Sequence, residues 1–224
     1  MIEGGYSGDH IHYKPNFLAS DPGIGTGDGG YAMYLGRLSP DKGIEVLVKA
    51  WDDLDDMPLQ VVGKGPMQEP ITKLAEQNEH VTHHDWVEFE QLGDILSRAA
   101  CLLLPTLNYE GFPRVLVEAF AYGVPVVTTN LGAMGRVIVD GENGRHIEYG
   151  DAEGLTRIVR ELMNDPEQRE HLRRGARRAY EDYYTAEINY QTMMSIYRQA
   201  RERFERSPRG RNFTPPKTKT PAAV

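Results

Sequence analysis

The chain has 224 residues, a formal net charge of −8 and a hydrophobic content of 40%. This length allows one sizeable α/β domain or two small ones. The acidic net charge argues against nucleic acid as a partner, because non-specific binding depends on phosphate neutralisation by Lys and Arg. The single cysteine, Cys101, excludes an internal disulfide framework, and we interpret it as a packing residue. Neither a bilayer-spanning stretch nor a secretory signal is recognisable, so we expect a cytoplasmic protein.

Short apolar runs alternate with helical patterns along most of the chain. Residues 43–53, for example, carry apolar side chains at the i, i+3, i+4, i+7 spacing of one buried helix face. Such alternation indicates βαβ units and predicts an α/β fold, a Rossmann-like doubly wound parallel sheet. The expected strands are 31–35, 59–62, 81–84, 101–104 and 124–127. The expected helices are 43–53, 66–77, 89–99, one from Pro113, and then 152–164, 166–184 and 186–204.

The pattern predicts four parts. Residues 31–184 are expected to form the Rossmann-like domain, and residues 185–206 a trailing C-terminal helix. Residues 207–224 are rich in Pro, Lys and Thr, have almost nothing to bury, and are expected to be disordered. Residues 1–30 have no strong periodicity and are expected to be a linker.

Two carboxylates, Glu110 and Glu118, lie eight positions apart in the segment EGFPRVLVE. Glu110 follows an apolar run and is therefore expected in the loop that leaves the carboxyl end of a strand, where open α/β sheets bind ligands. Pro113 is expected in the first turn of the next helix, because its missing N–H would be unpaired there. That helix would direct free N–H groups and a partial positive charge toward the same crevice, which favours phosphate binding.

The pattern E-G-F-x-x-x-x-x-E resembles the paired-glutamate motif of retaining GT-B glycosyltransferases, the "glycosyl transferases group 1" family. Three further segments resemble this family in the same order: GRLSPDKG at 36–43, VVGKGP at 61–66 and VVTTNLGAMGRVIVDGENG at 126–144. The resemblance covers the C-terminal, donor-binding half of a GT-B fold. The PNF sequence at 15–17 resembles the interdomain crossover, so residues 1–30 look like its remnant and 185–206 like the C-terminal crossover helix. The resemblance implies either a fragment or a chain whose N-terminal half comes from another polypeptide.

The resemblance also implies roles for individual residues. Transfer from a nucleotide sugar develops negative charge on the leaving diphosphate, which fixed cations and N–H donors stabilise. Arg37 and Lys42 resemble the diphosphate-binding pair of the family, and Glu118 resembles its ribose ligand. Glu110 is implied to be the catalytic residue that faces the donor sugar. The other expected donor-binding residues are Gly63, Gly65, Gly111, Phe112 and Pro113.

Two patterns suggest a metal site but have simpler explanations. Asp53-Leu54-Asp55 spells the D-x-D that holds a metal–diphosphate in the other large glycosyltransferase architecture, yet it lies in an acidic helix end and is interpreted as solvated surface. His83 and His84 are adjacent on an expected strand and so point to opposite faces. No nearby Cys or carboxylate supplies metal-ligand spacing. We therefore expect no metal and no other cofactor.

The leading hypothesis is a glycosyltransferase, of hexosyltransferase type, that transfers a sugar to a glycan, lipid or polysaccharide. The alternative is a non-catalytic nucleotide-sugar-binding subunit or truncated remnant. A Rossmann dehydrogenase is disfavoured, because no G-x-G-x-x-G separates the first strand from its helix. Basic residues at 169–178 and 198–211 are interpreted as a solvated helix face and tail, with peripheral membrane contact as the alternative. Trp86 is expected either to border the nucleotide base or to lie in the core.

Overall fold

The computed structural model describes residues 10–207, without the side chain of Phe89. The described residues form two compact units, Pro15–Ala186 and a smaller one that combines residues 10–14 with residues 187–207. The tail predicted at 207–224 lies outside the described residues except for Ser207, as do the first nine residues of the predicted linker.

The larger unit contains a six-stranded parallel sheet with the strand order β3-β2-β1-β4-β5-β6. Its central strand β1 pairs with β2 on one side and β4 on the other, so that Ala32 lies opposite both Leu59 and Cys101. The chain order reverses between β1 and β4, and the crevice beyond their carboxyl ends is where doubly wound sheets bind ligands. The strands are β1 Ala32–Leu35, β2 Leu59–Val62, β3 Val81–His84, β4 Cys101–Leu104, β5 Val126–Thr129 and β6 Gly144–Ile147.

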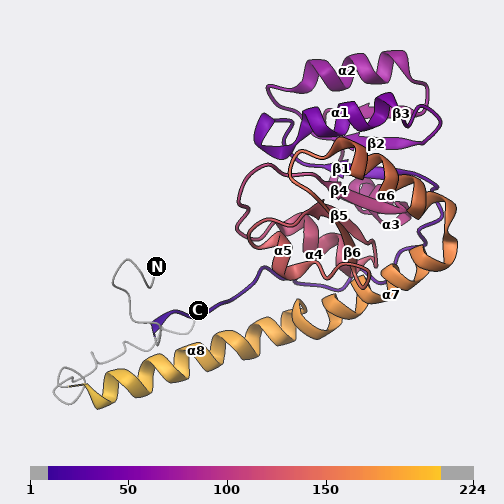
Figure 1. The fold of residues 1–224 in the computed structure, drawn as a ribbon. Coiled ribbons are helices and arrows are strands. Elements are labelled where there is room, and N and C mark those ends of the chain that lie inside the picture. Colours follow the sequence, from indigo (N-terminus) through magenta and orange to yellow (C-terminus); the bar gives the residue numbers. More distant parts are fainter. Residues whose placement is uncertain (1–9, 208–224) are drawn as a thin grey trace, which may run out of the picture. The chain divides into compact units, whose positions relative to one another are not determined.

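Helices cover both faces of this sheet, as Figure 1 shows. One face packs against α1 Ile44–Asp52, α2 Gln68–Gln77 and α6 Ala152–Asn164. The other packs against α3 Phe89–Arg98, α4 Arg114–Ala121 and α5 Met134–Val137. Helix α7, Pro166–Tyr183, contributes Leu172 to the first core cluster and Tyr180 to the second. The doubly wound α/β fold predicted from the sequence is confirmed.

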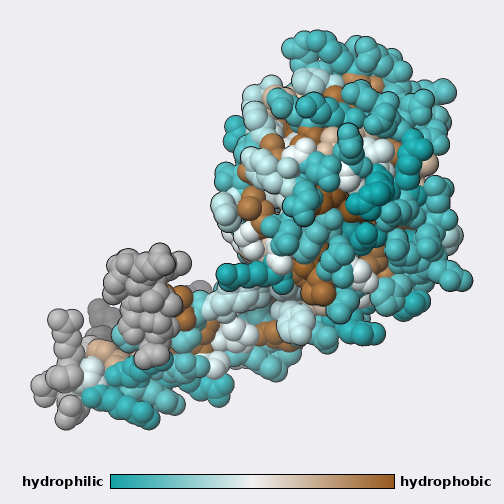
Figure 2. Space-filling model, viewed as in Figure 1, coloured by the Kyte–Doolittle hydropathy of each residue, from teal (hydrophilic) through white to brown (hydrophobic). Residues whose placement is uncertain are grey.

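Burial on both faces explains why the central strands are almost entirely apolar. All of β5 and most of β4 are buried. Burial raises the pKa of the Cys101 thiol to about 12, which is consistent with a packing residue. In contrast, the face of the domain visible in Figure 2 is mainly hydrophilic, and hydrophobic residues are scattered among the hydrophilic ones.

Several details differ from the sequence prediction. Strand β6 was missed because its sequence, GRHI, is polar at an edge of the sheet, and the four-residue helix α5 was also missed. Pro113 was predicted to lie in the first turn of α4, and this is wrong. Its φ of −63° and ψ of 134° are extended, so it occupies the N-cap and Arg114 is the first helical residue.

The glycine segment, Gly23–Gly30, is bonded to the domain although a linker was predicted up to residue 30. The backbone N–H of Gly25 donates to the carbonyl of the residue that follows α4, and those of Gly27 and Gly29 donate to carbonyls of α3, all over 2.8–3.0 Å. A Cβ at Gly25 would lie 2.2 Å from the Ser97 carbonyl oxygen, so only glycine permits this approach. The buried Arg173 of α7 donates to the Gly25 oxygen over 2.5 Å. The compact unit therefore begins at Pro15 and not at residue 31.

Helix α8, Ala186–Arg206, belongs almost entirely to the smaller unit. Ion pairs at i,i+4 spacing, such as Arg201–Glu205, support its exposed surface. No helix within residues 10–207 combines the length and apolar character required to cross a membrane. The role of α8 as a crossover helix remains a prediction, and so does a peripheral membrane contact.

Candidate functional site

The loops that follow β1 and β4 meet at the carboxyl edge of the sheet. The β1 loop contains a short 3-10 helix, Pro40–Lys42, and ends at Gly43 with a left-handed φ of 73°. A Cβ at Gly43 would lie 1.9 Å from the Pro105 carbonyl oxygen, so glycine is required where the loops approach. The Leu107 N–H donates to the Asp41 carbonyl over 2.8 Å and joins the loops directly.

An ion pair between Lys42 and Glu110 connects the same two loops through their side chains. The Lys42 and Glu110 side chains are only 32% and 19% exposed, so solvent screens this pair less than a surface pair. Glu110 thus lies in the loop beyond β4. The fold places the Lys42 ammonium group, a cation suited to phosphate, and the Glu110 carboxylate in the same corner of the crevice.

Hydroxyl groups fix the start of the loop that carries Glu110. Thr128 and Thr129 of β5 donate to the carbonyl oxygens of Leu104 and Thr106, over 2.7 and 2.5 Å. The buried Thr106 in turn places its Oγ1 3.2 Å from Glu110 Oε1. A series of hydrogen bonds therefore runs from the sheet to the carboxylate.

A pocket of about 240 Å³ opens between these loops. Tyr34 lies in its wall and donates its hydroxyl to the Arg37 carbonyl over 2.8 Å. Burial raises the pKa of the Tyr34 phenol above its usual range, and the negative charges of Asp41 and Glu110 act in the same direction. The phenol therefore remains a donor that shapes the β1 loop. The lining residues are Tyr34, Leu35, Gly36, Arg37, Lys42, Leu104, Thr106, Glu110, Pro113, Val115 and Met134.

Four of the predicted site residues line this pocket: Arg37, Lys42, Glu110 and Pro113. Glu118 does not. It lies on α4, and its Oε1 accepts from Arg114 Nε over 3.0 Å. The Glu118 side chain is 19% exposed and that of Arg114 is 67% exposed, so solvent and ligands can reach this pair.

The remaining predicted residues lie around the pocket without lining it. Cβ atoms at Gly63 and Gly65 would lie 1.9 and 2.3 Å from the carbonyl oxygens of Gly36 and Leu38. These two glycines are thus required by the close approach of the β1 and β2 loops, whether or not a nucleotide binds. Gly111 is exposed. Phe112 packs against Tyr184, with ring centroids 5.3 Å apart, and its carbonyl accepts from Asn16.

The sequence interpretation missed Tyr34, Thr106 and Met134 as parts of the site. Tyr34 and Met134 could not be separated from ordinary core residues, because both are buried hydrophobic positions. Thr106 did carry a signal: it is a polar residue two positions after a buried strand, at the edge where ligands bind.

The patterns that suggested a metal have local partners instead. His83 Nε2 lies 2.9 Å from the Gly63 carbonyl oxygen, whereas His84 Nε2 lies 2.9 Å from the side chain of Gln60. Over residues 10–207, no group of three or more His, Cys, Asp or Glu side chains is arranged to hold a metal ion. Trp86 is 73% exposed, so its interpretation as a core residue is wrong.

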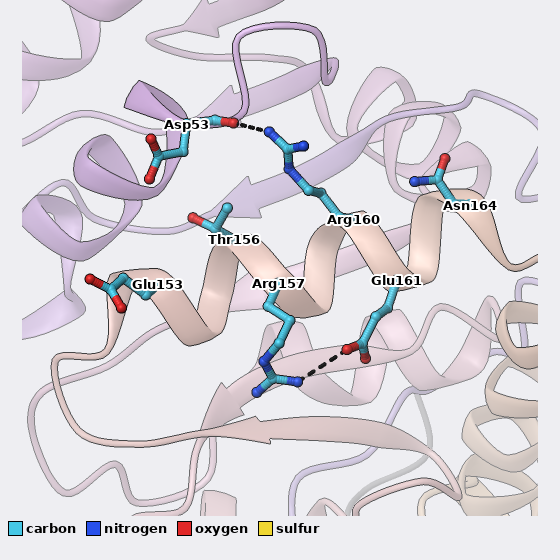
Figure 3. Close-up of a pocket in the computed structure, with 7 residues that line it drawn as sticks. All are labelled: Asp53, Glu153, Thr156, Arg157, Arg160, Glu161 and Asn164. Atoms are coloured by element: carbon cyan, nitrogen blue, oxygen red, sulfur yellow. Dashed lines mark hydrogen bonds and ion pairs between the residues drawn. The ribbon is translucent and has the colours of Figure 1, made fainter.

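A second, larger hollow of about 490 Å³ lies along α6, as shown in Figure 3. Its two arginines are already paired: Arg157 donates to Glu161, and Arg160 donates to the backbone carbonyl of Asp53. It also lies away from the carboxyl edge of the sheet, next to the C-terminal end of α1. We therefore place the candidate site in the smaller pocket, where a cation, a carboxylate and a helix N-terminus converge.

The chain matches the family model "Glycosyl transferases group 1" over residues 25–179. It is 30% identical over 208 residues to glycogen synthase from Mycobacterium tuberculosis, an alignment that covers 87% of this chain and 48% of that protein. Among solved structures, sucrose-phosphate synthase from Thermosynechococcus elongatus has a TM-score of 0.72 at 24% identity, with 84% of this chain and 52% of that one covered.

HepE from Anabaena, in complex with UDP and glucose, has a TM-score of 0.67 at 21% identity, with 76% of this chain and 48% of that one covered. The chain thus spans about half the length of each of these three proteins. The family match extends over well more than half of the chain and includes every strand of the sheet. This protein belongs to the glycosyl transferases group 1 family.

Proposed function

We propose that the pocket between the β1 and β4 loops binds a nucleoside-diphosphate sugar as the donor for retaining transfer of a hexosyl group. The observation that carries this proposal is the convergence of Lys42 and Glu110 beside the N-terminus of α4. A cation and helix N–H groups suit a diphosphate, and a carboxylate suits sugar hydroxyls or positive charge at the anomeric carbon. Family membership supports the reaction class.

The reaction breaks the bond between the anomeric carbon and a diphosphate oxygen, and the electron pair of that bond leaves with the diphosphate. Arg37 can bind the diphosphate in a bidentate manner, while Lys42 acts as a mobile point charge. In the free protein the positive charge of Lys42 is balanced by Glu110. When a donor binds, the phosphate becomes a second anionic partner for Lys42, and Glu110 is left facing the sugar.

Glu118 is proposed to accept hydrogen bonds from the ribose hydroxyls. In the free protein it is bonded to Arg114 from the preceding helical turn. An exposed i,i+4 pair contributes little to stability, so a ribose can compete for the carboxylate at small cost. The released Arg114, which is the first residue of α4, would then lie close to the phosphates.

The acceptor is proposed to be bound by a second Rossmann-like domain, as the resemblance to the GT-B fold implies, and this chain spans about half the length of its relatives. Much of the rate of transfer comes from holding the acceptor against the donor in a cleft that excludes water. The 224-residue chain alone is therefore expected to hydrolyse the donor slowly at most. A co-expressed N-terminal GT-B half should restore transfer.

The same half-length coverage favours a second candidate, a nucleotide-sugar-binding subunit without turnover of its own. The two candidates differ in one assay. A donor domain becomes an efficient transferase when the second half is supplied, whereas a non-catalytic subunit binds donor without turnover in either state.

A thermal-unfolding screen tests donor binding directly. Nucleoside-diphosphate sugars are tested for an increase in melting temperature, and a bound nucleotide sugar is identified by mass spectrometry. We expect at least one to stabilise the wild-type protein and to stabilise Lys42→Ala much less. Arg160→Ala, in the second hollow, serves as the control and should respond like the wild type. Equal stabilisation of Lys42→Ala would argue against the proposed site.

A further inference from the structure

The two carboxylate oxygens of Glu110 have different surroundings. Oε1 contacts both Lys42 Nζ and Thr106 Oγ1. For Oε2, the described part of the chain provides no hydrogen bond or ion pair. Two contacts on one oxygen restrict the rotation of the carboxylate, and they leave the other oxygen for a ligand in the pocket.

Thr106 is itself held firmly. It is only 2% exposed, and its backbone carbonyl accepts the 2.5 Å hydrogen bond from Thr129. Its Oγ1 also lies 3.2 Å from the Asp41 carbonyl oxygen and 3.3 Å from that of Asn108. A hydroxyl donates one proton at a time, and a carboxylate is a stronger acceptor than a neutral carbonyl. Glu110 is therefore the favoured acceptor, and the two carbonyls are alternatives.

Thr106 and Lys42 differ in what happens when a donor arrives. Lys42 is a partly exposed, flexible cation that a diphosphate can attract away from Glu110. Thr106 is buried and anchored to β5, so its hydroxyl stays beside Oε1. Building on the proposed function, we propose that Thr106 is a positioning residue that holds Glu110 Oε1 so that Oε2 faces the donor sugar.

Thr106→Val, which is close to isosteric, tests this role by removing only the hydroxyl, and Thr106→Ser keeps it. Thr156→Val is the matched control, because the Thr156 hydroxyl is placed to donate to the backbone carbonyls of Ala50 on α1 and Ala152 on α6, away from the donor pocket. Calorimetry measures the affinity of each variant for UDP-glucose, GDP-mannose, UDP and GDP. Thermal unfolding without ligand confirms that each variant is folded.

For whichever sugar nucleotide binds, we expect Thr106→Val to weaken binding by about tenfold, the size of one hydrogen bond to a charged group. Binding of the parent diphosphate should change by less than about twofold, because Thr106 acts only on the sugar-facing carboxylate. Thr106→Ser and Thr156→Val should match the wild type. In a Glu110→Ala background, Thr106→Val should have no further effect on sugar-nucleotide binding.

Two results would overturn this role. If Thr106 has only a structural role, Thr106→Val should weaken binding of the diphosphate and of the sugar nucleotide equally, or should still weaken binding when Glu110 is absent. Failure of the wild type to bind any nucleoside-diphosphate sugar of the thermal-unfolding screen would refute the proposed function, and the inference with it. Normal wild-type binding together with an unaffected Thr106→Val would refute the inference alone.

Discussion

Lys42 and Glu110 form an ion pair across 68 positions of sequence and join the loops beyond two adjacent strands. In the free protein each charge neutralises the other in a partly buried setting. We therefore expect the proposed donor to redistribute this pair when it binds.

Removing the carboxylate of Glu110 should not harm diphosphate binding. Glu110→Ala frees Lys42 from its partner, so the ammonium group becomes fully available to phosphate. We expect the affinity for UDP or GDP to stay equal or to rise, while the additional affinity due to the sugar is lost. Calorimetry with each diphosphate and its sugar measures the two effects separately. A large loss of diphosphate affinity would show that Glu110 supports the phosphate site and not the sugar.

Removal of the Glu118 carboxylate should instead weaken binding of the diphosphate itself. Glu118→Ala is expected to weaken binding of both diphosphate and sugar nucleotide by about 1.5–3 kcal/mol, the cost of losing hydrogen bonds to a charged acceptor. Glu205→Ala is a matched control, since Glu205 also accepts from an arginine four residues earlier on an exposed helix face. Similar losses from Glu110→Ala and Glu118→Ala would contradict their separate roles.

The glycine segment should be sensitive to a single methyl group at Gly27. Gly27 has a φ of +63°, and a Cβ there would lie 2.2 Å from Arg173 Nη1. Gly30 has a similar φ of +66° but open space around it, so Gly30→Ala measures backbone strain alone. We expect Gly27→Ala to be less stable than Gly30→Ala by about 1–2 kcal/mol, because Arg173 must move and lose its bond to Gly25. Urea unfolding of the two variants tests the difference.

The pair formed by Asp21 and Arg177 should make stability depend on pH. Two hydrogen bonds from Arg177 hold the pKa of the Asp21 carboxyl below its usual value. A lowered folded-state pKa means that the stabilisation is present above the unfolded pKa of about 3.9 and is lost as pH falls through the folded value.

Asp21→Asn should therefore be less stable than the wild type at pH 6, and this difference should shrink below about pH 4. We expect less than about 1 kcal/mol, because the Asp21 side chain is 45% exposed and solvent screens the pair. Urea unfolding at both pH values measures it. A difference that grows toward low pH would contradict this assignment.

The fold could be predicted from the sequence wherever a strand is buried on both faces. The runs at β4 and β5 are apolar because helices cover both sides of the sheet. Strand β6 could not be predicted in this way, since an edge position allows Arg145 and His146 to be partly exposed and removes the apolar signal. The glycine segment was taken for a spacer because its glycines serve close backbone contacts that only the folded structure reveals.

The candidate site could be predicted as far as the residue types that its chemistry requires. Glu110 was expected in the loop after a strand, the resemblance to the family implied Arg37 and Lys42, and the structure brings all three to one pocket. The ion pair itself could not be predicted, because the register of β1 against β4 sets the distance between Lys42 and Glu110. The contribution of Thr106 could not be predicted either, because it depends on how the folded loop places Glu110 Oε1 beside the Thr106 hydroxyl.

The central claim is that a nucleoside diphosphate binds between the β1 and β4 loops without a metal. An NMR titration of the 224-residue chain with UDP and GDP, in the presence of a chelator, tests it most directly. We predict saturable amide shifts concentrated at 36–43 and 106–118, with little change at 153–164 on α6. Shifts centred on the hollow around Arg157 and Arg160, or binding that disappears with the chelator, would contradict the account.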